Sequence, residues 1–138
     1  MTAVSPTPDT LELSREEERA WWRQAVVYQV YPRSFADADG DGIGDIRGIL
    51  SRVDYLAELG VDAVWLSPFY PSELADGGYD VADYRDVDPR LGTLGDVDEL
   101  VTALHDRGIL IAVDIVLKHT SERPAWSQGA HAGAHCAT

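Results

Sequence analysis

Alternating aspartates make residues 37–45 the segment of this sequence best suited to chemistry. Calcium and magnesium are hard cations that bind oxygen ligands, and calcium takes about six to eight of them in a flexible shell. Without a cation, four carboxylates this close together would repel one another. We therefore predict a structural calcium or magnesium site in this segment. Its predicted ligands are the carboxylates of Asp37, Asp39, Asp41 and Asp45 and the backbone carbonyl of Ile43.

Glycines separate these aspartates, and the loop differs from an EF-hand in its second half. We expect Gly40, Gly42 and Gly44 to supply the positive φ angles that a tight wrap around an ion requires. The twelfth position counted from Asp37 is Gly48, where an EF-hand has a bidentate glutamate. The segment before the loop also has the pattern of a strand rather than of a helix. The alternative interpretation is a solvated acidic turn.

The composition excludes several classes of partner. The chain has 138 residues and a formal net charge of −13, and 45% of its residues are hydrophobic, which is enough for a packed core. Nucleic acids and anionic membranes require clusters of lysine and arginine, so neither is an expected partner. The single cysteine, Cys136, excludes an internal disulfide. Because the first ten residues lack a basic start and an apolar run, we expect a cytoplasmic protein.

The hydrophobic periodicity predicts alternating strands and helices between two irregular ends. Short apolar runs predict strands, and apolar positions spaced by three and four predict helices. Ser14 and Glu17 have the spacing of a capping box, which predicts the start of the first helix. The predicted elements are a disordered tail over 1–11, helices over 14–23, 45–59 and 95–107, strands over 25–31, 61–66 and 109–117, and a long loop over 67–94.

This order of elements predicts an α/β fold with a parallel sheet. The predicted strands are apolar almost throughout, as in sheets that helices cover on both faces. Doubly wound sheets and (β/α)8 barrels both begin in this way. The dinucleotide-binding version is disfavoured, because the first turn after a strand carries aspartates and no G-x-G-x-x-G motif is present.

Four segments carry a resemblance to a known family. They are 27–35 (Val-Tyr-Gln-Val-Tyr-Pro-Arg-Ser-Phe), 60–68 (Gly-Val-Asp-Ala-Val-Trp-Leu-Ser-Pro), 76–80 (Asp-Gly-Gly-Tyr-Asp) and 114–119 (Asp-Ile-Val-Leu-Lys-His). Together with the acidic loop they resemble family 13 of the glycoside hydrolases, the α-amylase superfamily, in its α-glucosidase and oligo-1,6-glucosidase branch. The resemblance implies the first three βα units of a (β/α)8 barrel, incomplete in this chain. It places the barrel part at residues 12–121 and an irregular tail at 122–138.

The resemblance also implies a sugar-binding role for three residues. Asp76 and Tyr79 match residues that line the subsite for the glucose at the non-reducing end, and His119 matches a histidine that hydrogen-bonds the same glucose. A carboxylate can accept two sugar hydroxyls, and an aromatic ring can pack on the apolar face of a pyranose. The family has asparagine where this chain has Lys118, which only donates hydrogen bonds. Asp114, inside the third predicted strand, has either an orienting or a structural role.

The implied activity is retaining hydrolysis of terminal α-linked glucose from oligosaccharides. In this family the nucleophile, the acid/base and a supporting aspartate follow strands four, five and seven. We therefore expect no catalytic residue in this chain and no activity of the chain alone; the two carboxyl groups that a retaining enzyme requires would lie beyond it. The alternatives are a fragment of trehalose synthase or another α-transglucosylase, and a non-catalytic remnant that binds a cation.

Overall fold

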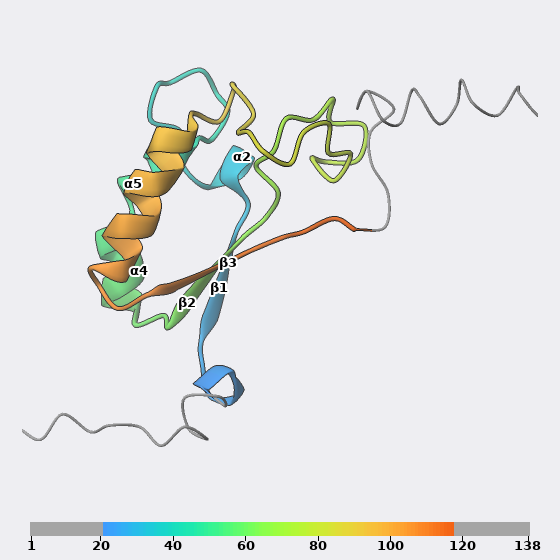
Figure 1. Ribbon diagram of the computed structural model, residues 1–138. Helices are drawn as coiled ribbons and strands as arrows, with labels where there is room; N and C mark the ends of the chain where they lie inside the picture. The colour runs from blue at the N-terminus through green and yellow to red at the C-terminus, as the bar shows by residue number, and fades with distance from the viewer. Residues whose placement is uncertain (1–20, 118–138) are drawn as a thin grey trace, which may run out of the picture.

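A three-stranded parallel sheet is the centre of the structure, a computed structural model that describes residues 21–117 (Figure 1). The strands are paired in chain order, and Ala63 of the central strand lies opposite Val27 on one side and Leu110 on the other. The strands are β1 (Val27–Val30), β2 (Ala63–Leu66) and β3 (Leu110–Val113). The predicted parallel α/β arrangement is confirmed.

Short helices connect the strands, and most of them match the predicted ranges. The 3-10 helix η1 is the described end of the first predicted helix, and α2 follows β1 directly, where no helix was predicted. Pro32 occupies the first helical position of α2, where its missing N–H is not needed. The helical elements are η1 (Trp21–Arg23), α2 (Pro32–Phe35), α3 (Ile46–Leu50), α4 (Val53–Leu59) and α5 (Leu94–His105).

The single helix predicted over 45–59 is wrong, because the structure divides it into α3 and α4. The hydrogen bonding changes at this point, because the Arg52 N–H donates to the carbonyl of Ile49, three residues earlier, rather than four as in an α-helix. The Ser51 hydroxyl also donates to the Gly48 carbonyl at 2.6 Å, a local bond that competes with continued helix. The predicted apolar face nevertheless survives the break, since the four large side chains on it are buried: Ile46, Ile49, Val53 and Leu56.

The helices cover one face of the sheet, and the opposite face is open in the described part of the chain (Figure 1). Val30, Val64 and Leu66 point toward the helices and are fully buried. On the other face, Trp65 is 39% exposed and Leu110 is 43% exposed. Within residues 21–117 the helices thus cover only one of the two apolar faces of the sheet. Such an open face is the side that forms the interior when a sheet closes into a barrel.

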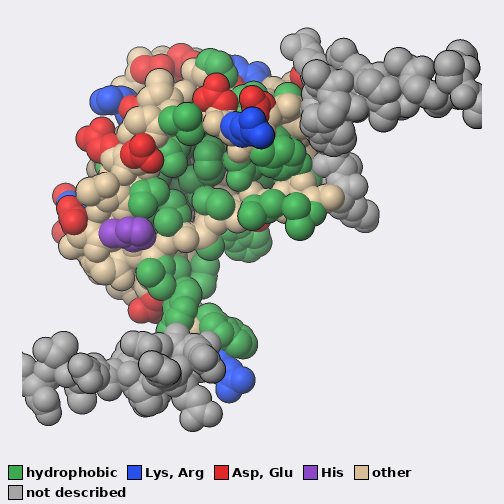
Figure 2. Space-filling view, in the orientation of Figure 1, with side chains coloured by type: hydrophobic (Ala, Val, Ile, Leu, Met, Phe, Trp, Pro, Cys, Tyr) green, Lys and Arg blue, Asp and Glu red, His purple; other side chains and the backbone are tan. Residues whose placement is uncertain are grey.

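The edge of β3 is a second exposed apolar surface in the described part of the chain, and Val113 there lies on the helix side of the sheet, because it is opposite Leu66. Figure 2 shows hydrophobic side chains gathered beside β3, with acidic side chains toward the rim. Val113, Ile115 and Leu117 are respectively 42%, 65% and 90% exposed. Within residues 21–117, none of the helices is long and apolar enough to span a membrane.

We predict that Gly48→Ala destabilises the fold by about 2 kcal/mol or more, because overpacking of a tight contact is costly. A Cβ atom at Gly48 would lie 2.0 Å from the backbone oxygen of Ala36. Urea unfolding followed by circular dichroism measures the effect. Gly95→Ala is the matched control in a helix, because its Cβ would meet nothing nearer than the Thr93 hydroxyl at 3.6 Å. An unfolding midpoint of Gly48→Ala equal to that of Gly95→Ala would contradict the prediction.

Candidate functional site

The segments that carry the predicted site residues lie together at the carboxyl ends of the strands (Figure 1). Residues 31–45 follow β1, residues 67–93 follow β2, and residues 114–117 follow β3. The parallel ladder continues past the strand ends, since the N–H of Ser67 donates to Val30 and the N–H of Asp114 donates to Leu66. This edge of a parallel sheet is where active sites of barrel enzymes are built.

Three of the four predicted metal-binding carboxylates form one cluster. Asp37, Asp39 and Asp45 each offer a carboxylate oxygen, and these oxygens all lie within 4.8 Å of one another. Asp41 is not in this cluster, and its carboxylate accepts the N–H of Ile43 at 2.7 Å. A cluster of this size fits a hard cation, and its three charges favour a divalent one.

Backbone N–H groups hold the acidic loop in shape. Asp37 accepts hydrogen bonds from the N–H groups of Gly40 at 2.6 Å and of Gly42 at 2.8 Å, and these bonds lower the pKa of the Asp37 carboxyl. Asp45 is the N-cap of α3, where it accepts the N–H of Gly48 at 2.6 Å, and it also accepts the N–H of Ala38 at 2.9 Å. The loop is therefore organised by its own aspartates.

The three loop glycines have two different roles. Gly40 and Gly42 have φ angles of +83° and +92°, as predicted, but Gly44 does not adopt a positive φ. A Cβ at Gly44 would instead lie 2.2 Å from the carbonyl oxygen of Pro32. Gly44 is thus required for the close approach of the loop to α2, a contact that the sequence alone did not reveal.

Asp80 closes the long loop after β2 into a defined shape. Its buried carboxylate accepts the Ser72 hydroxyl at 2.6 Å and the N–H groups of Glu73 and Asp76 at 3.1 and 3.3 Å. Burial raises the pKa of Asp80, but these hydrogen bonds outweigh it and the pKa is lowered. No pattern in the sequence assigns Asp80 a role, and the structure makes it the residue that shapes the loop around Asp76 and Tyr79.

Asp76 and Tyr79 stand at the two ends of one tight turn. The N–H of Tyr79 donates to the carbonyl of Asp76 at 2.9 Å. The two central residues, Gly77 and Gly78, have φ angles of +60° and +101°, as a type I′ turn requires. Asp76 is exposed and Tyr79 is half-buried. The structure therefore brings together two of the three predicted sugar-binding residues; the third, His119, lies outside the described residues, as do Lys118 and both predicted tails.

Asp114 lies directly after β3 and contacts the segment that follows β2. Its carboxylate accepts the Trp65 indole N–H at 2.8 Å and the Tyr79 hydroxyl at 2.9 Å. Its backbone carbonyl accepts the Tyr70 hydroxyl at 3.1 Å. The hydrogen bond to Asp114 raises the pKa of Tyr79. The residue that the sequence analysis placed inside the third strand is therefore at the end of that strand, beside the predicted sugar-binding turn.

An ion-pair cluster that sequence reasoning missed ties α2 to the same loop. Asp88 is buried and accepts hydrogen bonds from Arg33 at 2.8 Å and from Arg90 at 2.6 Å. Burial raises the pKa of Asp88, but the two guanidinium groups outweigh it and bring the pKa to about 2. Arg90 also donates to the carbonyl of Ser72 at 2.6 Å. A hint was available in the sequence, since Arg33 is a lone charge within an apolar and aromatic segment.

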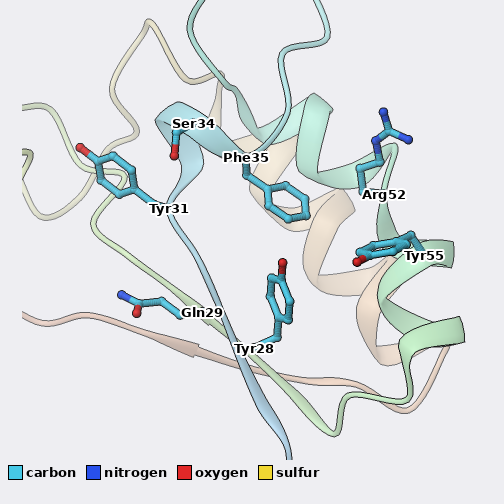
Figure 3. Close-up of a pocket in the computed structure, with 7 residues that line it drawn as sticks. All are labelled: Tyr28, Gln29, Tyr31, Ser34, Phe35, Arg52 and Tyr55. Atoms are coloured by element: carbon cyan, nitrogen blue, oxygen red, sulfur yellow. The ribbon is translucent and has the colours of Figure 1, made fainter.

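A pocket of about 560 Å³ lies along the edge of β1 that pairs with no strand within residues 21–117 (Figure 3). Tyr28, Phe35 and Tyr55 lie on one side of the strand, and the rings of Tyr28 and Phe35 meet edge to face with centroids 6.2 Å apart. Tyr31 points to the other side, and its hydroxyl donates to the carbonyl of Gly77 at 3.0 Å. Asp76 and Tyr79 do not line this pocket, which adjoins their turn through Tyr31.

Comparison with protein families identifies the class. The family model described as the catalytic domain of alpha amylase matches residues 29–136, which is most of the chain. The chain belongs to the α-amylase family of glycoside hydrolases, and its relatives place it in the α-glucosidase and oligo-1,6-glucosidase branch. The catalytic domains of this family are (β/α)8 barrels, so the three parallel strands are a part of such a barrel, as predicted.

The curated relatives are much longer than this chain. The oligo-1,6-glucosidase of Parageobacillus thermoglucosidasius is 56% identical over 109 residues, which are 79% of this chain and 19% of the relative. The alpha-glucosidase of Schizosaccharomyces pombe is 55% identical over 106 residues, which are 77% of this chain and 18% of the relative. This chain thus spans about a fifth of the length of the curated relatives it matches.

Solved structures share the same arrangement of elements. An alpha-glucosyl transfer enzyme, XgtA, is 55% identical with a TM-score of 0.76 over 78% of this chain and 20% of that one. The trehalose-6-phosphate hydrolase of Bacillus licheniformis is 46% identical with a TM-score of 0.80 over 83% of this chain and 21% of that one. Hydrolases and a transfer enzyme are therefore similar to this chain to a comparable degree.

We predict that acid weakens the fold through Asp88. The pKa of Asp88 in the folded protein is about 2, below the ordinary value of 3.8. The contribution of Asp88 to the free energy of unfolding is therefore present above pH 3.8 and is lost as the pH falls through 2. The difference corresponds to about 2 kcal/mol. Urea unfolding between pH 5 and pH 2, a window of about three units around these pKa values, measures it.

Asp88→Asn tests the origin of this pH dependence. The variant should be less stable than wild type at neutral pH, because the buried Arg33 loses its partner, and its stability should fall less steeply in acid. Asp98→Asn, which changes an exposed aspartate on α5, is the matched control and should behave like wild type. An unchanged acid slope in Asp88→Asn would show that the cluster does not carry the effect.

Proposed function

We propose that this chain is the N-terminal part of the catalytic barrel of a retaining α-glucosidase, which hydrolyses terminal α-linked glucose from oligosaccharides. The identity of 56% to an oligo-1,6-glucosidase and of 55% to an alpha-glucosidase supports this substrate class. The observation that carries the proposal is the tight turn that places Asp76 and Tyr79 side by side at the carboxyl edge of the sheet.

In this proposal each side chain of the turn has a distinct task. The Asp76 carboxylate accepts hydrogen bonds from the hydroxyls of the terminal glucose, and such charged hydrogen bonds are the stronger kind. The Tyr79 ring packs against the apolar face of the pyranose. His119, outside the described residues, is proposed to hydrogen-bond the same sugar. None of these residues is a nucleophile or an acid/base, so we propose that the 138-residue chain alone is inactive.

We further propose that the acidic loop binds a structural calcium or magnesium ion. The carboxylates of Asp37, Asp39, Asp41 and Asp45 and the carbonyl of Ile43 are the proposed ligands. The clustering of three carboxylate oxygens within 4.8 Å supports the site. The ion would supply positive charge that relieves carboxylate repulsion and ties the loop to the start of α3, which Asp45 caps.

A second candidate function is transfer of a glucosyl group rather than its hydrolysis. XgtA, an alpha-glucosyl transfer enzyme, is about as similar to this chain as the hydrolases are. Trehalulose synthase MutB is 48% identical with a TM-score of 0.78. Both reactions begin with recognition of the same terminal sugar, so the turn at Asp76 and Tyr79 serves either of them. A third reading is a non-catalytic remnant that binds the cation.

A chimeric enzyme tests the sugar-binding role of this chain. In the Parageobacillus thermoglucosidasius oligo-1,6-glucosidase, the 109 aligned residues are exchanged for those of this chain. We expect the chimera to hydrolyse p-nitrophenyl α-glucoside, and Asp76→Ala to lower its kcat/KM by about 100-fold, as loss of two charged hydrogen bonds would. Product analysis of the same reaction distinguishes hydrolysis from transfer.

Two controls accompany the chimera. Asp83→Ala removes another exposed aspartate of the same loop and should leave kcat/KM unchanged. The 138-residue chain alone should show no turnover. Turnover by the chain alone that disappears in Asp76→Ala would overturn the proposal that the chemistry lies elsewhere, and an active chimera that tolerates Asp76→Ala would remove the sugar-binding assignment.

Calorimetric titration with calcium and with magnesium tests the metal site in the chain itself. Asp39→Ala should weaken binding at least about tenfold, because it removes one of three clustered charges, and Asp41→Ala should weaken it less. Asp98→Ala on α5 is the control. Equal affinity of wild type and Asp39→Ala would refute the site.

A further inference from the structure

We propose that Asp114 is a positioning residue that fixes the Tyr79 ring and the Trp65 indole at the carboxyl edge of the sheet, and through Tyr79 sets the surface on which the sugar packs. This inference deepens the proposed function and rests on it for the identity of the sugar. We call the contacts of the Asp114 carboxylate with Trp65 and Tyr79 the clamp, and their geometry does not depend on which sugar binds.

Asp114 is placed where it can join the carboxyl ends of β2 and β3. It follows β3 directly, its carboxylate accepts from Trp65 on β2 at 2.8 Å, and it accepts from Tyr79 in the loop after β2 at 2.9 Å. Tyr70 donates to its backbone carbonyl at 3.1 Å, which holds the residue itself in place. Two aromatic side chains are thus oriented by the two oxygens of one carboxylate.

The turn that carries Tyr79 needs such a clamp. Its central residues, Gly77 and Gly78, have no side chains that could pack and restrain the turn. Tyr31 restrains the backbone by donating to the Gly77 carbonyl at 3.0 Å, and Asp80 restrains the start of the loop. The Tyr79 ring is half-buried, and the bond from its hydroxyl to Asp114 fixes the direction of the ring together with the contact of that hydroxyl with Ser67.

The charge of Asp114 gives the clamp a measurable signature. The groups that face the Tyr79 hydroxyl are the Asp114 carboxylate, the Tyr31 phenol and the Ser67 hydroxyl. The Asp114 bond raises the pKa of Tyr79, since a phenolate beside a carboxylate is disfavoured. Asparagine can accept from Trp65 and donate to the Tyr79 oxygen, so Asp114→Asn removes the charge while keeping hydrogen-bonding groups on both sides.

Spectrophotometric titration of the tyrosines in the 138-residue chain tests the clamp. In Asp114→Asn we expect one tyrosine to ionise at lower pH than in wild type. Combining Asp114→Asn with Tyr79→Phe should abolish that shift, which assigns it to Tyr79. Asp98→Asn is the matched control and should leave the titration unchanged. An identical titration in wild type and Asp114→Asn would overturn the proposal.

Binding of methyl α-glucoside, measured by saturation-transfer NMR, connects the clamp to the sugar. Asp114→Ala should weaken binding about tenfold. Comparing the circular dichroism of Asp114→Asn with that of wild type shows whether this milder variant keeps the fold. Equal binding by wild type and both variants would overturn the positioning role. Absence of binding by wild type would refute the proposed sugar site, whereas the tyrosine titration would still decide whether Asp114 clamps Tyr79.

Discussion

Burial of one sheet face beneath the helices is the constraint on which the rest of the structure depends. The central strand β2 contributes Val64 and Leu66, both fully buried, to the contact with the helices, whose buried residues include Leu56 and Leu100. Removing such side chains from water supplies most of the favourable free energy of folding. Because parallel strands share a direction, fixing the sheet also fixes a single edge at which three successive connections emerge. The candidate site is a consequence of that edge.

Aspartates then shape the connections. Within the described part of the chain, Asp45, Asp80, Asp88 and Asp96 are all buried, and each accepts hydrogen bonds from nearby backbone or side-chain donors. Asp96 completes a capping box with Thr93 at the start of α5. A carboxylate suits this task because it accepts several hydrogen bonds at once and binds them more strongly than a neutral oxygen does. Part of the acidic character of the chain is therefore structural.

The sequence predicted what depends on local pattern and missed what depends on distant pairing. The parallel order and the apolar face of residues 45–59 follow from periodicity, and both were confirmed although the helix itself is broken. The strands lie within their predicted ranges, but the third ends at Val113 rather than at residue 117. Clustering of Asp37, Asp39 and Asp45 follows from their spacing along one loop. The partnership of Arg33 with Asp88 joins positions 55 residues apart, and no local pattern reports such a contact.

The same distinction applies to single residues whose local roles were misread. Gly44 was expected to provide a positive φ, yet its function is to let the loop touch the backbone of α2, and only the packed structure reveals that neighbour. Asp114 was ambiguous for a related reason. Its partners Trp65 and Tyr79 come from other segments, and the hydrogen-bonding capacity of a carboxylate says nothing about which donors a fold will bring to it.

The short helix α2, which was not predicted, is the support that the two candidate binding elements share. On one side, the N–H groups of Gly44 and Asp45 in the acidic loop donate to the carbonyls of Arg33 and Ala36 at 2.7 and 2.9 Å. On the other side, the Arg33 side chain pairs with Asp88 in the loop that carries the proposed sugar-binding turn. Backbone atoms of α2 thus bind one element while a side chain of the same helix binds the other. An ion that orders the acidic loop would therefore also stabilise α2, and through the Arg33–Asp88 pair the loop that contains Asp76 and Tyr79. None of the ion's ligands would need to contact the sugar.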